Sequence, residues 1–494
     1  MELLKKSFNA TKWQTIALVV NFVTNTLVVG VLARLLFPED FGVIAIANTV
    51  INLTSMIADV GVGQYIIREP NVDRTCIQAV ITTTFLIGLI YIIALSIAAP
   101  FVARFYKMPQ LTALIIIIAL SVAIRKIGLI SQNLLYKELR FKEVAITDII
   151  SYVVGYGIIG IIMALLGCGV YSLVIALLLK ATLHTVMTYC LSPHTLVPSK
   201  DKKKILEVLK FGGGVMTLSM AGSVAYQAPA LIMGKILPSA QVGFYDRAMT
   251  YAIYPVTATG SIFDKVFYSA AAKLNANGGS DKQAGDIFLK LITILALPGF
   301  IGSAILIVGA EDFIRILLGE NWLDVVPIFQ IICMSIYFRI IVGFTDAVYK
   351  LKNILYKATG IRIVYAASVV ITVLVLALTT KNLVIICIGI NIAVLLNYIL
   401  SLFLVKQKLK IMFYDCIIVT VKYLFVSVVG AFLYYYVRVT IMKLFYNCVA
   451  FAVLDLVLLP ILAILTLFIF FHSDFKKLKN KVLELKNNLN SKNV

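Results

Sequence analysis

Apolar stretches of about twenty residues, separated by short polar segments, recur along nearly the whole chain. A helix needs about 20 apolar residues to cross a bilayer, so the pattern predicts about fourteen transmembrane helices. The expected spans are 13–36, 42–66, 77–103, 111–131, 146–166, 170–191, 208–236, 243–270, 284–308, 325–349, 358–380, 383–405, 414–436 and 445–471. Strand-like alternation is absent, which argues against an outer-membrane barrel. The predicted fold class is therefore an all-α polytopic membrane protein.

The composition supports this class. The chain has 494 residues, of which 61% are hydrophobic and only 14% are charged. Soluble globular domains carry about 25% charged residues, so a soluble globule is excluded. The formal net charge of +20 is the one feature that could indicate a nucleic-acid partner.

The placement of the basic residues gives this charge another meaning. Lys and Arg are concentrated on alternate loops, including "KELRFKE" (137–143), "KDKKK" (200–204) and the Lys-rich tail. The opposite set of span ends holds few: Arg34, Arg104, Lys107, Lys235, Arg315, Lys381, Arg438 and Lys443. By the positive-inside rule, an even number of spans then puts both termini in the cytoplasm. The basic excess indicates topology, and no nucleic-acid partner is expected.

Cysteine and histidine usage argues against a metal centre. The seven cysteines form no CxxC pair, and His184, His194 and His472 are scattered. We therefore expect no metal site and no bound cofactor.

Two segments resemble each other at a constant offset. "ARLLFPEDFGVIAIA" (33–47) and "GKILPSAQVGFYDRA" (234–248) align Arg34 with Lys235 and Gly42 with Gly243, since 235 − 34 = 201 and 243 − 42 = 201. An offset of an even number of helices gives both halves the same membrane orientation. We expect a six-helix bundle in 1–200, a parallel six-helix bundle in 201–410 facing it across a central cavity, and a helical pair with a basic cytoplasmic tail in 411–494.

Several ionisable residues fall inside expected spans. A charge at the membrane centre costs about 2.5–3.5 kcal/mol on insertion scales, and it usually faces a cavity or a partner. Lys180, with His184 one turn later, Arg339 and Arg247 are candidate cations for binding a phosphate group in a cavity. The alternative is structural: Arg339 pairs with Asp346, Lys180 with an acid on a neighbouring helix, and Arg247 with a nearby acid or the interface.

Polar side chains also follow one face of the first and seventh expected spans. They are Gln14, Asn21 and Asn25 in the first span and Ser219, Ser223 and Gln227 in the seventh. Such stripes line a cavity or hold helices together. Asp59 and Asp346 are candidates for binding a coupling ion, because burial raises a carboxyl pKa towards neutrality. For Asp59, helix capping or pairing is the alternative.

Three stretches resemble the Wzx-type polysaccharide exporters: residues 134–174, "ARLLFPEDFG" and "LLGENWLDVVPIFQ" (317–330). The branch that contains colanic-acid and teichuronic-acid exporters is the most similar. The resemblance implies the multidrug/oligosaccharidyl-lipid/polysaccharide flippase superfamily, with two six-helix bundles in a V around a cavity.

The resemblance also implies an activity, which is to move undecaprenyl-pyrophosphate-linked oligosaccharide across the bacterial cytoplasmic (inner) membrane for surface polysaccharide synthesis. Alternating access, coupled to a proton or sodium gradient, is the expected mechanism. Candidate partners are the lipid bilayer, a polysaccharide polymerase and chain-length machinery, and a bundle with an internal cavity can act as a monomer.

Two other functions stay open at this stage. A multidrug/cation antiporter on the same scaffold would favour acidic groups in its interior, whereas the deep charges here are mostly basic. A membrane-embedded polysaccharide polymerase or glycosyltransferase would use acids in an external loop, such as Glu311 and Glu320. No nucleotide-sugar or metal-binding arrangement accompanies these acids, so we expect a transporter and not an enzyme.

Overall fold

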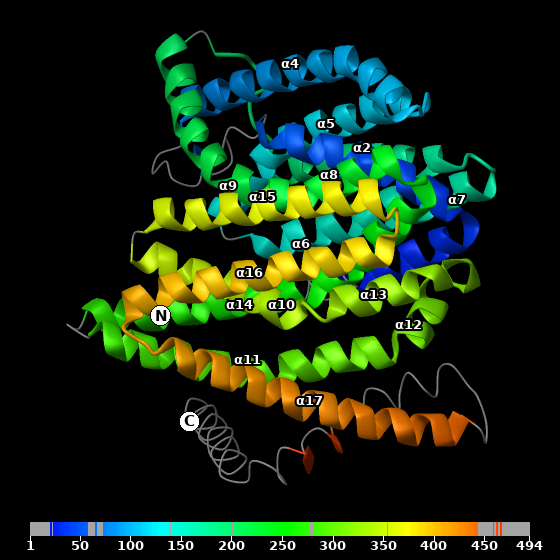
Figure 1. The fold of residues 1–494 in the computed structure, drawn as a ribbon. Helices are drawn as coiled ribbons and strands as arrows, with labels where there is room; N and C mark the ends of the chain where they lie inside the picture. The colour runs from blue at the N-terminus through cyan, green and yellow to red at the C-terminus, as the bar shows by residue number, and fades with distance from the viewer. Residues whose placement is uncertain are drawn as a thin grey trace. The chain divides into compact units, whose positions relative to one another are not determined.

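The structure is a computed structural model that describes residues 20–21, 23–57, 65–66, 73–138, 140–199, 201–276, 280–352 and 354–442, with residues 458, 461–462 and 465–466. Within these ranges, side chains are not described for residues 56–57, 210–222, 258, 260–276, 350, 355 and 441–442. Every regular element in the described part of the chain is a helix (Figure 1). The prediction of an all-α membrane protein is confirmed.

The helices follow one another with short connections. Their bounds are α2 (Pro38–Ile57), α4 (Arg74–Tyr106), α5 (Leu111–Lys137), α6 (Phe141–Ile150), the π-helix η1 (Ser151–Ile158), α7 (Ile159–Leu165), α8 (Val170–Leu191), α9 (Lys202–Ile236), α10 (Ser239–Ala276), α11 (Asp281–Val308), α12 (Ala310–Leu317), the 3₁₀-helix η2 (Glu320–Val325), α13 (Val326–Cys333), α14 (Ile336–Leu351), α15 (Leu355–Thr379), α16 (Leu383–Leu409) and α17 (Phe413–Met442). A shorter apolar helix covers Val23–Leu35.

Eight described helices are long and apolar enough to cross a membrane, and a ninth span results if one bent pair is counted as one. The expected span 170–191 coincides with α8. The expected count of fourteen stays a prediction, because most of the last span, 445–471, and the start of the first lie outside the described residues.

The described chain groups into two compact units. Unit 1 contains the described residues up to Asp246, with Leu317–Asn321 and Val369–Lys381. Unit 2 contains Arg247–Ile316, Trp322–Ser368 and the described residues from Asn382 onward. The expected division of the chain into two six-helix bundles and a helical pair, with boundaries at residues 200 and 410, stays a prediction.

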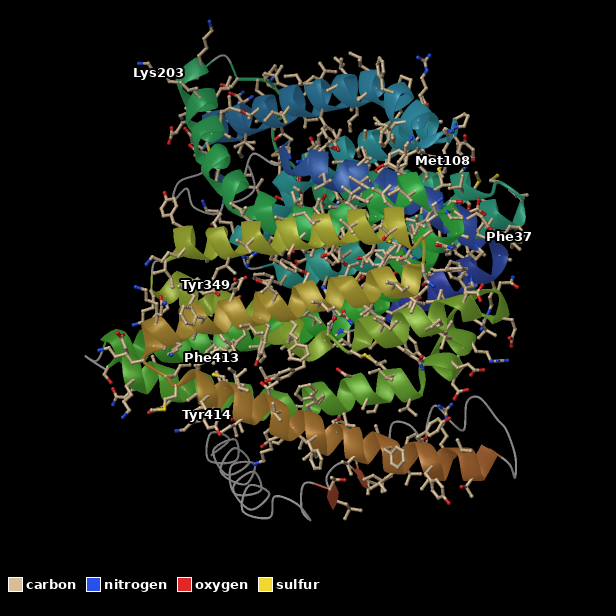
Figure 2. All side chains as sticks on the ribbon, in the orientation of Figure 1. Phe37, Met108, Lys203, Tyr349, Phe413 and Tyr414 are labelled. Atoms are coloured by element: carbon tan, nitrogen blue, oxygen red, sulfur yellow. The ribbon has the colours of Figure 1, made fainter. Side chains whose placement is uncertain are left out.

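In unit 1, α5 is the central helix. It packs against α4 on one side and α8 on another, while α8 also contacts η1, α7, α6 and α2. Lys203, in the expected cytoplasmic linker, lies at the opposite end of these helices from Met108 and Phe37, which are in expected external loops (Figure 2). The linker that contains Lys203 and the two connections that contain Met108 and Phe37 therefore lie at opposite ends of these helices, and which end faces the cytoplasm stays a prediction.

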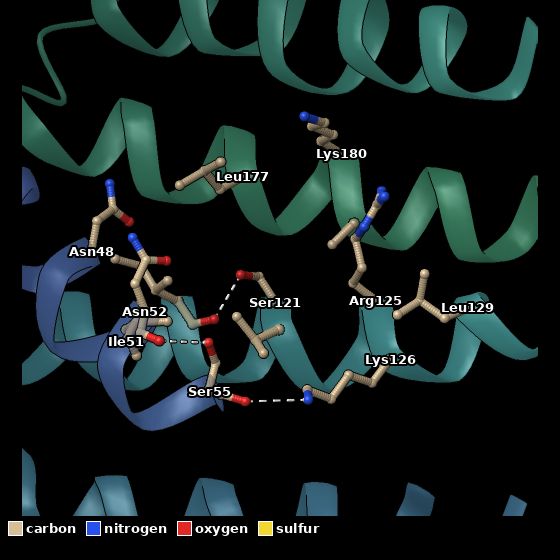
Figure 3. A pocket seen from close by; sticks show the side chains of 13 residues that line it. Asn48, Ile51, Asn52, Ser55, Ser121, Arg125, Lys126, Leu129, Leu177 and Lys180 are labelled. Atoms are coloured by element: carbon tan, nitrogen blue, oxygen red, sulfur yellow. Dashed lines mark hydrogen bonds between the residues drawn. The ribbon is translucent and has the colours of Figure 1, made fainter. Parts of the chain in front are cut away.

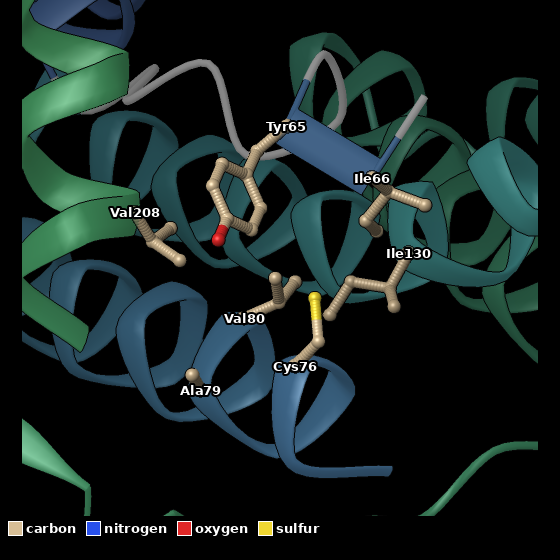
Figure 4. Close-up of a cluster of buried hydrophobic side chains, with 7 residues drawn as sticks. All are labelled: Tyr65, Ile66, Cys76, Ala79, Val80, Ile130 and Val208. Carbon is tan, nitrogen blue, oxygen red and sulfur yellow. The ribbon is translucent and has the colours of Figure 1, made fainter. Parts of the chain in front are cut away.

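A buried apolar cluster joins α4, α5 and α9 near the start of α4 (Figure 4). Its members are Tyr65, Ile66, Cys76, Ala79, Val80, Ile130 and Val208. Helix α4 begins beside this cluster, where the Asp73 carboxylate accepts a hydrogen bond from the Cys76 backbone N–H at 2.7 Å. The N-cap supplies a partner for an otherwise unsatisfied N–H and fixes where α4 starts.

The two repeated segments contact each other within unit 1. A Cβ on Gly42 would lie 1.8 Å from the Ser239 carbonyl oxygen, and one on Gly243 would lie 2.3 Å from the Pro38 carbonyl oxygen. At the offset of 201, Gly243 is the equivalent of Gly42 (243 − 42 = 201) and Ser239 is the equivalent of Pro38 (239 − 38 = 201). The contact of Gly42 with Ser239 is therefore repeated by the contact of Gly243 with Pro38. Segments related by a two-fold axis make this kind of reciprocal contact. Only glycine fits at both positions.

In unit 2, α11 packs against α17, α13, α14 and α16. The span expected as continuous over 325–349 is in fact broken: the helical stretches ending at Cys333 and starting at Ile336 are bent by 49°. At the break, the Met334 N–H donates to the Ile331 carbonyl at 3.2 Å, and the Ser335 N–H donates to the Ile332 carbonyl at 3.0 Å. These i−3 bonds tighten the chain locally and replace the α-helical ladder.

Candidate functional site

A polar cavity of about 500 Å³ lies inside unit 1, between α2, α5 and α8 (Figure 3). All its lining residues belong to these three helices: Asn48, Ile51, Asn52, Ser55, Ile118, Ser121, Val122, Arg125, Lys126, Leu129, Leu177, Lys180 and Ala181. Two asparagines and two serines face three basic side chains, and no acid is among the lining residues. The cavity is therefore suited to an anion.

The three cations have different partners. Lys126 Nζ lies 3.5 Å from the Ser55 carbonyl oxygen, and Lys180 Nζ lies 4.4 Å from the centre of the Tyr152 ring. Arg125 makes no hydrogen bond or ion pair with the residues that the structure describes. A guanidinium at membrane depth usually faces a cavity or a partner, so Arg125 is the cation whose donors are open to a ligand.

Close helix contacts hold these side chains in place. A Cβ on Gly155 of η1 would lie 2.5 Å from the Lys180 Cα, and one on Gly128 of α5 would lie 2.9 Å from the Thr185 Cα. The Thr185 hydroxyl also donates to the Ile124 carbonyl at 3.0 Å. Small residues permit this close approach of membrane helices. The turns carrying Lys180 and Arg125 are thereby fixed on facing helices.

The π-helix beside Lys180 connects the cavity to the first apolar helix. The Tyr152 hydroxyl donates a hydrogen bond to Oδ1 of Asn25 while its ring contacts Lys180. Single-turn π-helices are frequent at functional sites. Asn25, one of the expected cavity-lining residues, is thus joined to Lys180 through one aromatic side chain.

His184, expected to lie beside Lys180, is fully buried on α8. Its Nε2 atom is 3.1 Å from Oδ1 of Asp148 on α6. Neither ring nitrogen has a hydrogen bond in the described part of the structure. This pair lies next to the cavity without lining it.

Arg339 belongs to unit 2, at the break between α13 and α14. Its Nε donates to the Ser335 hydroxyl at 3.0 Å, and one terminal nitrogen is buried without a described partner. Asp346 pairs with Arg362 of α15 and not with Arg339. The described cavity therefore contains Lys180 alone among the three expected cations.

The remaining expected site residues are dispersed. Arg247 is half-buried on α10, Ser223 and Gln227 are half-buried on α9, and Asn21 is half-buried. Gln14 and Asp59 lie outside the described residues, as does the Ser219 side chain. Their proposed roles stay predictions.

Sequence reasoning overlooked Arg125 and Lys126, although both fall within the expected span 111–131. Helix α5 continues without a break to Lys137. Arg125 is therefore 12 residues (137 − 125) from the end of α5, which is about 18 Å along the axis. The uninterrupted helical pattern of 111–137 was the signal that could have placed both charges in the interior.

The fold and the cavity together describe a polytopic helical membrane protein with a cavity lined by three basic side chains. The chain belongs to the family described as "Polysaccharide biosynthesis protein", whose match covers residues 31–327, or 297 (327 − 31 + 1) of the 494 residues. The resemblance to the Wzx-type exporters is thereby confirmed.

Two relatives illustrate the family. An "Uncharacterized membrane protein in cps region" from Klebsiella pneumoniae is 25% identical over 339 residues, which are 68% of this chain and 69% of the relative. The "Lipopolysaccharide biosynthesis protein WzxC" of Escherichia coli (strain K12) is 20% identical over 336 residues, 68% of each chain.

A solved structure shows the same fold. The "Lipid II flippase MurJ" in its inward closed conformation superposes with a TM-score of 0.73 at 13% identity, covering 94% of this chain and 99% of that one. The chain therefore shares its fold with this flippase.

Proposed function

We propose that the protein moves a lipid-linked oligosaccharide across the bacterial cytoplasmic membrane, with the pyrophosphate bound in the cationic cavity of unit 1. The observation that carries the proposal is the convergence of Arg125, Lys126 and Lys180 on one polar cavity without an acid among its lining residues. Arg offers a planar fork to phosphate oxygens and Lys a compact charge.

The family and the fold support this choice. One relative's name refers to a "cps region" and the other's to lipopolysaccharide biosynthesis, and the superposed structure is that of a lipid II flippase. A polyprenyl tail needs no protein path, because it stays in the bilayer while the headgroup crosses. The undecaprenyl carrier and coupling to a proton or sodium gradient belong to the same proposal, as does the cytoplasmic location of both termini.

The membrane potential adds a driving force. Moving one elementary charge across 100 mV is worth about 2.3 kcal/mol. With the inside negative, an anionic headgroup is driven outward, which is the direction required for export.

A multidrug/cation antiporter is the less favoured alternative. Its cationic substrates would be repelled by Arg125, Lys126 and Lys180, since like charges in a low-dielectric site oppose binding.

The test follows lipid-linked oligosaccharide in cells that lack this protein. We expect the lipid to accumulate on the cytoplasmic leaflet without the protein and to clear with the wild type. Arg125→Ala and Lys180→Ala should each leave most of it trapped at matched membrane levels, whereas Lys137→Ala, at the end of α5 and outside the cavity, should clear it normally. A null strain that accumulates no lipid contradicts the function, and normal clearance by both cavity variants contradicts the site.

A further inference from the structure

The pair formed by buried His184 and half-buried Asp148 has no role in phosphate binding as described above. His184 is 0% exposed, and its Nε2 atom is 3.1 Å from Oδ1 of Asp148. Neither imidazole nitrogen has a hydrogen bond among the described residues. A buried polar group without a hydrogen bond requires an explanation, and the Asp148 carboxylate beside Nε2 is the charged group nearest at hand.

The pair is one helical turn from the cavity. Lys180 lines the cavity and precedes His184 by four residues (184 − 180) on α8, so both side chains lie on one face. Asp148 interacts electrostatically with Lys180, and so does Arg125. A change of charge at His184 or Asp148 therefore changes the electrostatic potential at the cavity cations.

Helix α8 and the elements packed against it also carry other titratable groups. Helix α7 has none, and α2 has only Glu39 and Asp40, at its first turn. Helix α6 contributes Lys142, Glu143 and Asp148, and η1 contributes Tyr152 and Tyr156. Helix α5 contributes Arg125, Lys126, Tyr136 and Lys137, and α8 itself contributes Tyr171, Lys180, Tyr189 and Cys190 beside His184. Histidine is the side-chain type that most readily exchanges a proton near neutral pH, and His184 is the one histidine among these groups.

We propose that the His184–Asp148 pair binds a proton when an anion occupies the cavity, so that proton uptake and phosphate binding are linked. This inference rests on the proposed function, because it assumes that the cavity takes a lipid phosphate. It assigns the proton a site that differs from the candidates suggested by the sequence, Asp59 and Asp346.

The physical argument is electrostatic. In the empty cavity, Arg125, Lys126 and Lys180 oppose a further positive charge on His184, while Asp148 favours it. A bound phosphate offsets the cavity cations and leaves the imidazolium paired with Asp148. Linkage is reciprocal: if the anion promotes protonation, then protonation strengthens anion binding by the same factor.

The experiment measures sulfate binding to the purified full-length protein by calorimetry at pH 6 and pH 8. Sulfate remains a dianion over this range, so any proton taken up belongs to the protein. For the wild type we expect affinity to be about fivefold higher at pH 6, with roughly half a proton taken up per sulfate in buffers of different ionisation enthalpy.

Two variants of the pair and one control make the result specific. His184→Gln should lose most of the difference in affinity between the two pH values and most of the proton uptake. Asp148→Asn should bind more tightly than the wild type at pH 8 and lose the pH dependence, which provides a second test if His184→Gln does not fold. His194→Gln, on the connection after α8 and outside the cavity lining, should behave like the wild type.

The outcomes separate the two proposals. If the wild type binds sulfate without taking up a proton, the linkage is overturned and the anion site remains. The same conclusion follows if His184→Gln takes up as much proton per sulfate as the wild type. Wild-type protein that binds no sulfate, or binds it as well after Arg125→Ala and Lys180→Ala, overturns the anion site and the linkage with it.

Discussion

The surroundings of a basic residue distinguish a ligand-binding role from a structural one, as Arg125, Lys126 and Lys180 show. They face one polar cavity, whereas Arg362 and Arg438 pair with acids in unit 2. The sequence placed Lys180 and His184 on one face correctly, because four residues along a helix is a local relation. It could not show that Asp346 pairs with Arg362, since that contact depends on how α14 and α15 pack.

The pair between Asp312 and Arg438 illustrates the structural role. Asp312 is 1% exposed, and Arg438 also donates to the Val308 carbonyl. Arg438→Ala would remove this ion pair from a buried carboxylate, so we expect a loss of about 3–5 kcal/mol in unfolding free energy, measured by denaturation in detergent.

Arg315→Ala is the matched control on α12. Arg315 forms an i,i+4 pair with the exposed Glu311 at 2.9 Å, so its loss should cost less than about 1 kcal/mol. Equal costs for Arg438→Ala and Arg315→Ala would contradict the buried-pair account.

The hydrogen bonds of Asp73, at the start of α4, make the stability of the fold depend on pH. Hydrogen bonds from the Thr75 hydroxyl, the Cys76 N–H and Lys204 lower the pKa of Asp73 from 3.8 to about 2. A lowered pKa in the folded state stabilises the fold above the ordinary pKa of 3.8, and this stabilisation is lost as pH falls towards about 2. The stability difference between wild type and Asp73→Asn should therefore shrink between pH 4 and pH 2 in denaturation experiments. A constant difference over that range would be inconsistent with the capping bonds.

At the scale of helices, the apolar runs predict the elements well. The expected range 170–191 is α8, and 284–308 lies within α11 (Asp281–Val308). The π-helix after Asp148 and the break at Met334–Ser335 were not predicted. The π-helix contains Gly155, where a Cβ would lie 2.5 Å from the Lys180 Cα, and the hydrophobic period does not encode such a close approach of two helices.

The reciprocal contact of Gly42 and Gly243 gives a prediction at this scale. Each Cβ would meet backbone atoms of the other segment, so Gly42→Ala and Gly243→Ala should each cost about 1–3 kcal/mol in unfolding free energy. Because both substitutions separate the same two segments, the double variant should cost about 0.5–3 kcal/mol less than the sum.

Gly302→Ala on α11 is the control, since a Cβ there meets nothing within 4 Å. It should leave stability unchanged or increase it by a fraction of about 1 kcal/mol, as alanine favours helix. Strict additivity of the two repeat variants would show that the contact is not shared.

At the scale of the whole molecule, the family and fold followed from hydropathy and quoted motifs, but the grouping of the chain did not. Unit 1 includes Leu317–Asn321 and Val369–Lys381, segments distant in sequence from its main part. Such grouping reflects tertiary packing. The cavity inside unit 1 was equally hidden, because its lining comes from three helices separated by up to about 130 residues (180 − 48).

The central claim is that the cations of α5 and α8 carry the phosphate of a lipid-linked glycan across the bilayer. Its most direct test is the rate at which lipid-linked oligosaccharide in proteoliposomes becomes accessible on the opposite leaflet. We expect Arg125→Ala and Lys180→Ala to slow this rate at least about tenfold, the loss of roughly one charge-assisted hydrogen bond, while Lys137→Ala keeps the wild-type rate. Rates for both cavity variants equal to that of the wild type would contradict the account.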